Sequence, residues 1–581
     1  MAQCLVTTLS ESVSNPNIVA PDELVIKVNH VDDLDSVSGA RWITFTFRSY
    51  ATVRMANTSY SFQDGDGNSL GSEVSFNINV AQRLYFPNPA AGNSYKVIVS
   101  NKYALAGLDT LEYPSTQYDF FEFDLSDLKY CTYLASLRCM CHKVTGSLAD
   151  LDHIPDINYI QIGRTGVSGD LANLKKNPGL RYLKAGASDI YGDIAILKDL
   201  PLLRNFEVGS CLEVYGNLSA FANHTSINYV SLPQMASHPA IEGDIANLAG
   251  CTSLTTFNAT NEAKITGDIS ALTNLEYLST IYLGGTSVYG NISSLAGKTK
   301  LITVSLGNSY SETFIGPSDN KLLGNIASLS NLPQLTILAL AYTGVTGDMA
   351  DLINVPRLAD LYLTNTAVTG EAADFGPQAM PNLKILDIGG CAGIEGDIAD
   401  MAGHDHLQTL YIWSTNISGD IGEALEDCTT LTAVNFTRTN VSGDVTKVYK
   451  NTSLLTGDVS GCINLEGDLS QLPPNFYYLV SNGRNGATFS WSANNARPSS
   501  STIVCFDNVN FGADLEKMLI NQASCQPRGV VGSWLHRRMY VYGSNTSATS
   551  MSAECRTACD TLIEMGFTIY INDVLVPASN A

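Results

Sequence analysis

The chain has 581 residues, and its 56 acidic residues outnumber its 33 lysines and arginines, so the formal net charge is −23. An apolar content of 45% with only 15% charged residues excludes an intrinsically disordered chain, which has less to bury and more charge. The acidic balance argues against a nucleic-acid-binding protein, because phosphate neutralisation needs clustered lysine and arginine. No apolar run approaches the ~20 residues that cross a bilayer, which argues against membrane insertion.

The first residues and the cysteines bear on the cellular compartment. Met1–Thr8 contains no basic stretch followed by an apolar core, so no secretory signal is visible. The 13 cysteines are odd in number and lack the spacing of a disulfide framework. We therefore expect reduced, buried thiols.

Residues 1–119 show no internal repeat and alternate apolar with polar residues in several short runs. Turn-forming clusters such as Asp64–Asn68 separate these runs. The pattern predicts a β-sandwich over residues 1–119. The runs that predict strands are Leu24–Val28, Trp42–Phe47, Val74–Val80 and Tyr95–Val99.

From about residue 120 an eight-residue motif recurs, and Val345–Leu352 (Val-Thr-Gly-Asp-Met-Ala-Asp-Leu) is a clear copy of it. Its glycine returns every 23 to 27 residues, with one gap of 34. Chance does not produce such a series, so this part of the chain is a repeat array. The glycines of the motif are Gly146, Gly169, Gly192, Gly216, Gly243, Gly267, Gly290, Gly324, Gly347, Gly370, Gly396, Gly419, Gly443 and Gly467.

Between these glycines a second motif reads L-x-x-L-x-L-x-x-T-x-V, as in Leu358–Val368. Its L-x-L pair has a period of two and predicts a short strand with Leu361 and Leu363 turned inward. Thr366 follows the strand, where a small hydroxyl or thiol can bond to backbone groups. The next glycine and its Asp or Asn are predicted to form a turn. The counterparts of Thr366 are Thr165, Ser188, Cys211, Thr286, Thr343, Cys391, Thr415 and Thr439.

Together, these motifs resemble the leucine-rich repeat family, in its 24-residue form with the L-x-G-x-I segment of plant-type repeats. The resemblance covers residues 120–472 and implies an α/β solenoid, in which stacked coils share an apolar core and form a parallel β-sheet. The family usually has Pro after the Ile, whereas this chain has Ala or Ser, which makes a plant receptor ectodomain a poor match. Insertions at 309–321 and 233–240 interrupt the array and are predicted to be surface loops.

Residues 473–581 lack the repeat motif and are predicted to form an α/β module that caps the last coil. Predicted strands are Thr502–Phe506, Met539–Tyr542 and Phe567–Ile571, and predicted helices are Asp514–Gln522 and Ala553–Met565.

The aspartates that follow the motif glycines would stack into a ladder, which raises the alternatives of a cation site or a paired-carboxylate hydrolase. A turn role is favoured, because asparagine replaces aspartate freely within the chain. The aspartates are Asp170, Asp193, Asp244, Asp268, Asp348, Asp397, Asp420, Asp444 and Asp468, and the asparagines are Asn217, Asn291 and Asn325.

Other groups suggest metal sites, but a structural role is favoured for each. Cys131, Cys139, Cys141 and His142 are clustered, yet Cys139 falls on an inward repeat position. Asp64–Asn68 lacks the glutamate of a calcium loop and is favoured as a hairpin turn. The pairs Cys555 and Cys559, and His404 and His406, are weaker still. We find no catalytic motif and expect no enzyme activity, metal or cofactor.

Aromatic side chains on the outward strand positions are the best candidates for binding. On a concave sheet, rings suit a sugar face or a protein surface, although tyrosine and threonine are also good strand residues that pack between rungs. The Tyr411–Trp413 pair is the preferred site. The candidates are Tyr159, Tyr182, Tyr229, Tyr282, Tyr362, Tyr411 and Trp413.

The repeats, with tail segments Phe511–Asn521 and Gly566–Asn572, are similar to those of leucine-rich proteins on gut-bacterial surfaces and of phage fibres. That resemblance and the absent signal favour a non-enzymatic phage virion fibre or decoration protein, assembled in the host cytoplasm. Its N-terminal domain would dock to other virion proteins, and its solenoid would bind a host surface glycan or protein. A homo-oligomer is expected. The alternatives are a bacterial surface adhesin and a cytoplasmic protein-interaction scaffold.

Overall fold

A computed structural model describes most of the chain. The described residues are 23–29, 40–48, 51–56, 62–63, 68–71, 73–87, 90–91, 93–110, 120–233, 241–307, 322–448, 453–481, 487–492, 504–525, 538–544 and 546–579. The start of the chain, most of the Asp64–Asn68 turn and nearly all of both predicted insertions therefore lie outside the described residues. The chain divides into two compact units, Met1–Thr266 (unit 1) and Gly267–Ala581 (unit 2).

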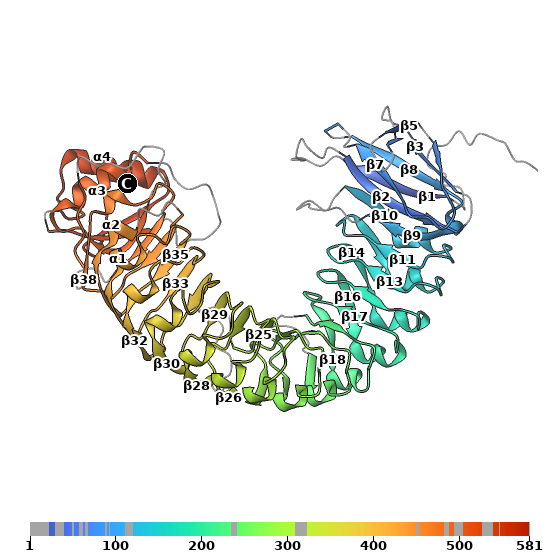
Figure 1. Cartoon of the computed structure of the whole chain (residues 1–581). Helices are drawn as coiled ribbons and strands as arrows, with labels where there is room; N and C mark the ends of the chain where they lie inside the picture. Colours follow the sequence, from blue (N-terminus) through green and yellow to red (C-terminus); the bar gives the residue numbers. More distant parts are fainter. Residues whose placement is uncertain are drawn as a thin grey trace, which may run out of the picture. The chain divides into compact units, whose positions relative to one another are not determined.

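The first strands of unit 1 form two antiparallel sheets, β6-β3-β8-β1-β10 and β5-β4-β7-β2-β9 (Figure 1). Rings from both sheets pack against each other. The ring centres of Phe45 of β2 and Phe76 lie 5.6 Å apart, and those of Phe86 of β7 and Phe121 of β10 lie 6.3 Å apart. These strands are β1 (Leu24–Asn29), β2 (Ala40–Phe47), β3 (Thr52–Ala56), β4 (Phe62–Gln63), β5 (Ser69–Gly71), β6 (Glu73–Ser75), β7 (Gln82–Pro87), β8 (Ser94–Ser100), β9 (Leu105–Asp109) and β10 (Phe121–Asp124).

Both sheets continue past the predicted boundary at residue 119. Strand β9 pairs in parallel with β11 (Ser136–Arg138), and β10 pairs in parallel with β12 (Val144–Ser147). Three of the four predicted strands of this region are confirmed, whereas Val74–Val80 is a strand only over Glu73–Ser75. Among the described residues, strands on both sides of residue 119 pair in the same two sheets, so the 1–119 domain stays a prediction.

The L-x-L motif forms the first parallel sheet, as predicted. Its leucine positions are buried; Leu361 and Leu363, for example, have no exposed surface, because they pack against the same positions in neighbouring coils. In unit 1 the sheet continues from β11 through β13 (Tyr159–Gln161), β15 (Tyr182–Lys184), β17 (Asn205–Glu207), β19 (Tyr229–Ser231) and β21 (Thr256–Asn258).

The V-x-G-D segment was predicted as a turn, but it forms a second parallel sheet, which corrects that prediction. Its valine or isoleucine is buried, and the glycine has φ between 101° and 154° in every coil, a region that side chains other than glycine rarely adopt. In unit 1 the strands after β12 are β14 (Gly166–Asp170), β16 (Asp189–Asp193), β18 (Glu213–Asn217), β20 (Ile241–Asp244) and β22 (Ile265–Asp268).

A short 3₁₀ helix follows most strands of the second sheet, and the residue after the glycine caps it. Asp170 Oδ1 accepts a hydrogen bond from the backbone N–H of Ala172 at 2.8 Å, and Asn217 Oδ1 accepts one from Ser219 at 2.9 Å. The helices of unit 1 are η1 (Lys102–Ala104), η2 (Leu125–Leu128), η3 (Leu148–Leu151), η4 (Leu171–Lys176), η5 (Ile194–Asp199), η6 (Leu218–Phe221) and η7 (Ile245–Leu248).

Unit 2 repeats this architecture. Its first sheet has β23 (Thr280–Tyr282), β25 (Thr303–Ser305), β27 (Ile337–Ala339), β29 (Asp360–Tyr362), β31 (Ile385–Asp387), β33 (Thr409–Tyr411), β35 (Ala433–Asn435), β37 (Thr456–Asp458) and β39 (Tyr478–Val480). Its second sheet has β24 (Ser287–Asn291), β26 (Leu322–Asn325), β28 (Gly344–Asp348), β30 (Ala367–Glu371), β32 (Gly393–Asp397), β34 (Asn416–Asp420), β36 (Asn440–Asp444) and β38 (Asn464–Glu466).

The helices between the coils of unit 2 are mostly 3₁₀ turns. The motif copy that is one residue longer instead forms an α-helix, α1 (Ile421–Leu425). The other helices before the tail are η8 (Ile269–Leu272), η9 (Ile292–Leu295), η10 (Ile326–Leu329), η11 (Met349–Leu352), η12 (Ala372–Phe375), η13 (Ile398–Met401), α2 (Val445–Val448) and η14 (Leu469–Gln471).

The tail adds strands to the first sheet. In parallel order, β40 (Cys505–Asn510) pairs with β39, β41 (Arg538–Tyr542) with β40, and β42 (Thr568–Ile571) with β41. Strand β43 (Val574–Leu575) returns antiparallel to β42. The predicted helices are α3 (Leu515–Gln522), which η16 (Gly512–Asp514) precedes, and α4 (Ala553–Glu564). The sheet thus continues beyond residue 472, so the 473–581 boundary stays a prediction.

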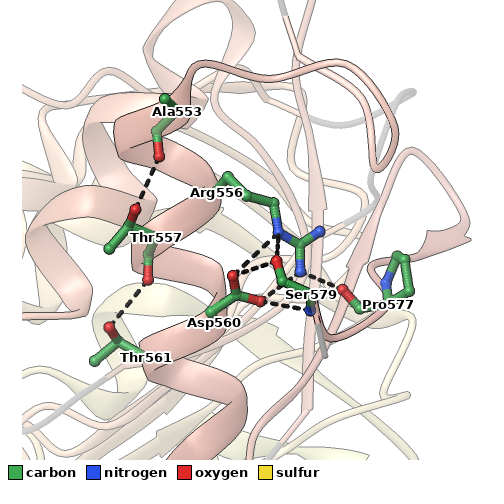
Figure 2. A network of polar contacts seen from close by, with 7 residues as sticks. All are labelled: Ala553, Arg556, Thr557, Asp560, Thr561, Pro577 and Ser579. Atoms are coloured by element: carbon green, nitrogen blue, oxygen red, sulfur yellow. Dashed lines mark hydrogen bonds and ion pairs between the residues drawn. The ribbon is translucent and has the colours of Figure 1, made fainter. Parts of the chain in front are cut away.

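A polar network ties the end of the described chain to α4 (Figure 2). Arg556 donates to Asp560 and to the carbonyl of Pro577, and its Nε donates to Ser579 Oγ at 2.9 Å. The backbone N–H of Ser579 donates to Asp560 Oδ1 at 3.1 Å. These hydrogen bonds, with the Arg556 guanidinium, hold the pKa of Asp560 well below its usual range.

Candidate recognition surface

The small polar residue after the first strand stabilises each coil, as the sequence predicted. Its hydroxyl donates to the carbonyl oxygen three residues earlier, at 2.6 Å for Thr165 and 2.8 Å for Thr366. Where the residue is cysteine, the thiol instead donates to a carbonyl of the preceding coil: Cys211 to Ala185 at 3.1 Å, and Cys391 to Leu363 at 3.0 Å. The cysteines therefore connect neighbouring coils.

The cysteines of the described residues are free and buried. Burial raises the pKa of Cys131 to about 12 and raises the pKa of Cys139 well above its ordinary value, so both favour the uncharged thiol. Within the described ranges no group of three His, Cys, Asp or Glu side chains is placed to hold a metal ion. Nor does any described helix have the length and apolar character to span a bilayer.

Of the paired histidines, His404 is 1% exposed, and its Nε2 lies 2.7 Å from the carbonyl oxygen of Phe375 in the preceding coil. Burial lowers the pKa of His404, although the carbonyl contact and Asp405 oppose that shift. His406 is exposed. This geometry makes His404 a structural residue of the core.

The seven candidate aromatic residues lie on the outward face of the first sheet or at its edge, and all are half-buried. Strand register separates them into three columns that cross the strands. Tyr159, Tyr182 and Tyr229 belong to the column at the start of each strand; Tyr282, Tyr362 and Tyr411 belong to the column at its end; and Trp413 lies two residues further along.

In unit 1 the outward aromatic residues form a small packed group. The rings of Tyr159 and Tyr182 lie 4.9 Å apart, and the guanidinium of Arg138 lies 5.6 Å from the ring centre of Tyr159. Asn205 follows Tyr182 in the register, and Tyr229 follows Asn205. Asn205 is only 7% exposed, and its Oδ1 has no hydrogen-bond partner among the described residues.

In unit 2 an aspartate lies between the candidate tyrosines. The register pairs Tyr362 with Asp387 and Asp387 with Tyr411. Thr364 Oγ1 donates to Asp387 Oδ1 at 2.5 Å, and the backbone N–H of Gly389 lies 3.4 Å from the same oxygen. Burial raises the pKa of Asp387, and these hydrogen bonds only partly offset the rise.

The same acidic surroundings act on the tyrosines. Burial, with the negative charges of Asp360 and Asp387, raises the pKa of Tyr362 to about 12. Burial and Asp387 also raise the pKa of Tyr411. Asp360 and Asp387 therefore place negative charge beside these phenol rings, with Lys384 near Asp360.

Trp413 lies over the glycine backbone of the preceding coil. A Cβ atom built on Gly389 would collide with the indole of Trp413, and one built on Gly390 would lie 3.3 Å from it. The two glycines thus leave the space that the indole occupies, a relation that the sequence motif by itself does not indicate.

The outward residues of the tail strands were not predicted as candidates from the sequence. Asp507, Tyr540 and Tyr570 continue the column of Tyr362 and Tyr411 across β40–β42. The rings of Tyr540 and Tyr570 are stacked, with their centres 4.3 Å apart and an angle of 5° between their planes. The alternating runs Met539–Tyr542 and Phe567–Ile571 were the available signal, but nothing in them shows that these strands join the repeat sheet.

Several solved structures are similar to this chain. The leucine-rich repeat ectodomain of the Arabidopsis receptor kinase HAESA, in complex with an N-terminally extended IDA peptide hormone, has 19% identity and a TM-score of 0.50, covering 73% of this chain and 74% of that one. An internalin from Listeria monocytogenes has 16% identity, a TM-score of 0.38 and coverage of 61% and 87%. A leucine-rich repeat protein of Leptospira interrogans has 11% identity and a TM-score of 0.42, and the match covers 64% of this chain and 91% of that one.

No protein-family model and no curated protein matches the sequence. The repeat motif, the stacked parallel strands and the likeness to the HAESA ectodomain together show that the chain has the leucine-rich repeat fold.

Proposed function

We propose that the chain is a non-enzymatic recognition protein. It binds a surface molecule, such as a glycan or a protein, through the outward face of its first sheet. The observation that carries this proposal is the half-exposed aromatic face, with Tyr411 and Trp413 in one coil and Tyr362 two coils before them. Rings in such positions supply contact area at a low entropy cost. The HAESA ectodomain, which has the same fold, was solved with a peptide hormone bound.

The finer proposal is a phage virion fibre or decoration protein. It rests on the resemblance of the repeats and tail to phage and gut-bacterial surface proteins. The buried thiols are compatible with assembly in a reducing host cytoplasm. In this proposal the N-terminal strands dock to other virion proteins, the solenoid meets a host glycan or protein, and the chain assembles as a homo-oligomer.

The binding face is tested by Trp413→Ala in the full chain, with Tyr289→Ala as the matched control. Tyr289 is 41% exposed but belongs to the second sheet. We expect Trp413→Ala to reduce adsorption to host cells by more than about tenfold, as for a central interface residue, while the control binds like the unaltered chain. Equal adsorption of both variants, with unchanged thermal unfolding, would exclude this face.

The location is tested by mass spectrometry of purified particles. Detection of the chain in phage virions supports the fibre proposal. Its recovery on the bacterial envelope supports the adhesin alternative, and its recovery only in the cytosol supports the scaffold. A glycan array then distinguishes a carbohydrate receptor from a protein receptor.

A further inference from the structure

One column of outward residues in unit 2 carries acids and rings without basic residues among them. Each of its members is half-exposed. From β29 to β42 the register aligns Tyr362, Asp387, Tyr411, Asn435, Asp458, Val480, Asp507, Tyr540 and Tyr570, which we call the acidic–aromatic column.

The carboxylates of this column accept hydrogen bonds from neutral groups, and Arg538 acts on Asp507 only through its charge. Asp387 accepts from Thr364 and Gly389, and Asp458 Oδ1 accepts from the backbone N–H of Ser460 at 3.0 Å. Asp507 accepts from Tyr478 at 3.4 Å and from Asn508 at 3.1 Å. Among the described residues, none of the three aspartates forms an ion pair.

The corresponding column of unit 1 has a different charge pattern. There Asp109 forms an ion pair with Arg138 at 2.7 Å, and Lys184 and Glu207 are register neighbours. The column of unit 1 thus contains both acids and bases, whereas the column of unit 2 has three acids and no base. A lysine or arginine from a partner would supply the missing positive charge, and flanking tyrosine rings attract the same cations.

We propose that the acidic–aromatic column binds a basic segment of a protein partner, with a lysine or arginine side chain seated at Asp387 between Tyr362 and Tyr411. This inference rests on the proposed recognition function and specifies its ligand class. The net charge of −23 would steer a basic partner toward the chain from a distance, and the column would provide the docking positions.

The column also sets a spacing for its ligand. Asp387 and Asp458 are three strands apart, which is about 14 Å at the usual strand separation of ~4.8 Å. An extended peptide rises about 3.3 Å per residue, so two basic side chains about four residues apart match the two carboxylates. The second cation is expected at Asp458, beside Asn435.

The probe is a soluble peptide with two arginines about four residues apart, titrated into the full chain by calorimetry. The test variant is Asp387→Asn with Asp458→Asn. Asparagine has nearly the same side-chain shape as aspartate. Its amide oxygen can also accept the hydrogen bond from the backbone N–H two residues later, as Asn435 Oδ1 does from Thr437 at 3.0 Å. The fold is therefore expected to survive, and thermal unfolding verifies it.

The matched control is Asp397→Asn with Asp420→Asn. It removes the same charge from helix caps of the second sheet, a position that Asn217 fills elsewhere. We expect the column variant to weaken peptide binding by about tenfold or more, and the control by less than about twofold. Equal weakening in both variants, or none in the column variant, overturns the inference.

Host-cell adsorption separates this inference from the function on which it rests. If Trp413→Ala abolishes adsorption, the column variant adsorbs normally and a glycan array captures the chain, then recognition stands and the basic-partner inference is overturned. If the column variant loses peptide binding but neither variant alters adsorption, then the cation site stands and the proposed function of this face fails.

Discussion

Gly419 shows why the repeat needs glycine before its capping residue. Its φ is 101°, and a Cβ atom there would collide with the carboxylate of Asp397, the cap of the preceding coil. The same relation recurs between Gly443 and Asp420. Each glycine thus allows the positive φ that its own position requires, and it also leaves room for the capping side chain of the preceding coil. The G-D pair of one coil is therefore coupled to that of the next.

Gly419→Ala is therefore expected to lower the free energy of unfolding by about 1–3 kcal/mol, the usual cost of a side chain forced into such backbone. Gly179→Ala is the control, because a Cβ there meets no atom within 4 Å and its φ is not in the left-handed region. The control should change stability by less than about 0.5 kcal/mol. Denaturant unfolding of both variants measures this, and equal stabilities would contradict the stacking explanation.

His404 makes the core sensitive to acid. Its folded pKa is lowered, so below the unfolded value of about 6.5 the unfolded chain binds more protons than the folded chain. The contribution of His404 to the free energy of unfolding should therefore stay constant above that pH and fall as the pH drops toward the folded pKa, by about 1.4 kcal/mol per unit of separation.

His404→Asn should remove this component of the pH dependence. Asn177 occupies the same repeat position and donates to the carbonyl of Ile154 at 2.9 Å, so an amide fits this role without titrating. Thermal unfolding between about pH 5 and 8 compares the variants, with exposed His406→Gln as control. An identical pH profile for His404→Asn and the unaltered chain would show that His404 does not titrate on unfolding.

At the scale of elements, the tail is a continuation of the first sheet. Strands β40–β42 add to β39 in parallel, and α3 and α4 pack together beside them. The Arg556–Asp560 pair then holds the final described residues against α4 (Figure 2). The tail thus extends the outward face of the array, and its role as a cap stays a prediction.

Arg556→Ala should release residues 577–579 without unfolding α4, because the helix keeps its buried Cys555, Ala558 and Leu562. Hydrogen exchange of the C-terminal peptide should then be faster, by about tenfold if about 1.4 kcal/mol of local protection is lost. Lys517→Ala, which breaks the exposed pair with Asp514, is the control. Unchanged exchange at the C-terminus in Arg556→Ala would show that the network does not restrain it.

At the scale of the whole molecule, the chain combines a strongly acidic composition with buried thiols and a repeated apolar core. In each unit both parallel sheets follow the repeat, so outward residues from coils more than 20 positions apart become neighbours. Such a surface suits recognition of an extended partner, because every coil adds one position to each column.

The fold was largely predictable from the sequence. The glycine series and the L-x-L pairs are periodic, and a stacked core demands the same inward residues in each coil, so local pattern and global fold agree. Thr366 and its counterparts were assigned correctly for the same reason. The second sheet was missed, because a glycine with positive φ is typical of turns and only pairing between coils shows it to lie in a strand.

The sequence by itself determined the repeat, its inward core and the outward position of the candidate aromatic residues, since these follow from periods within one coil. Only the tertiary structure decided which outward residues are neighbours: that Asp387 lies between Tyr362 and Tyr411, and that tail strands carrying Tyr540 and Tyr570 extend the same column. The physical reason is that register across coils depends on stacking, so residues far apart in the chain become adjacent only when the coils assemble.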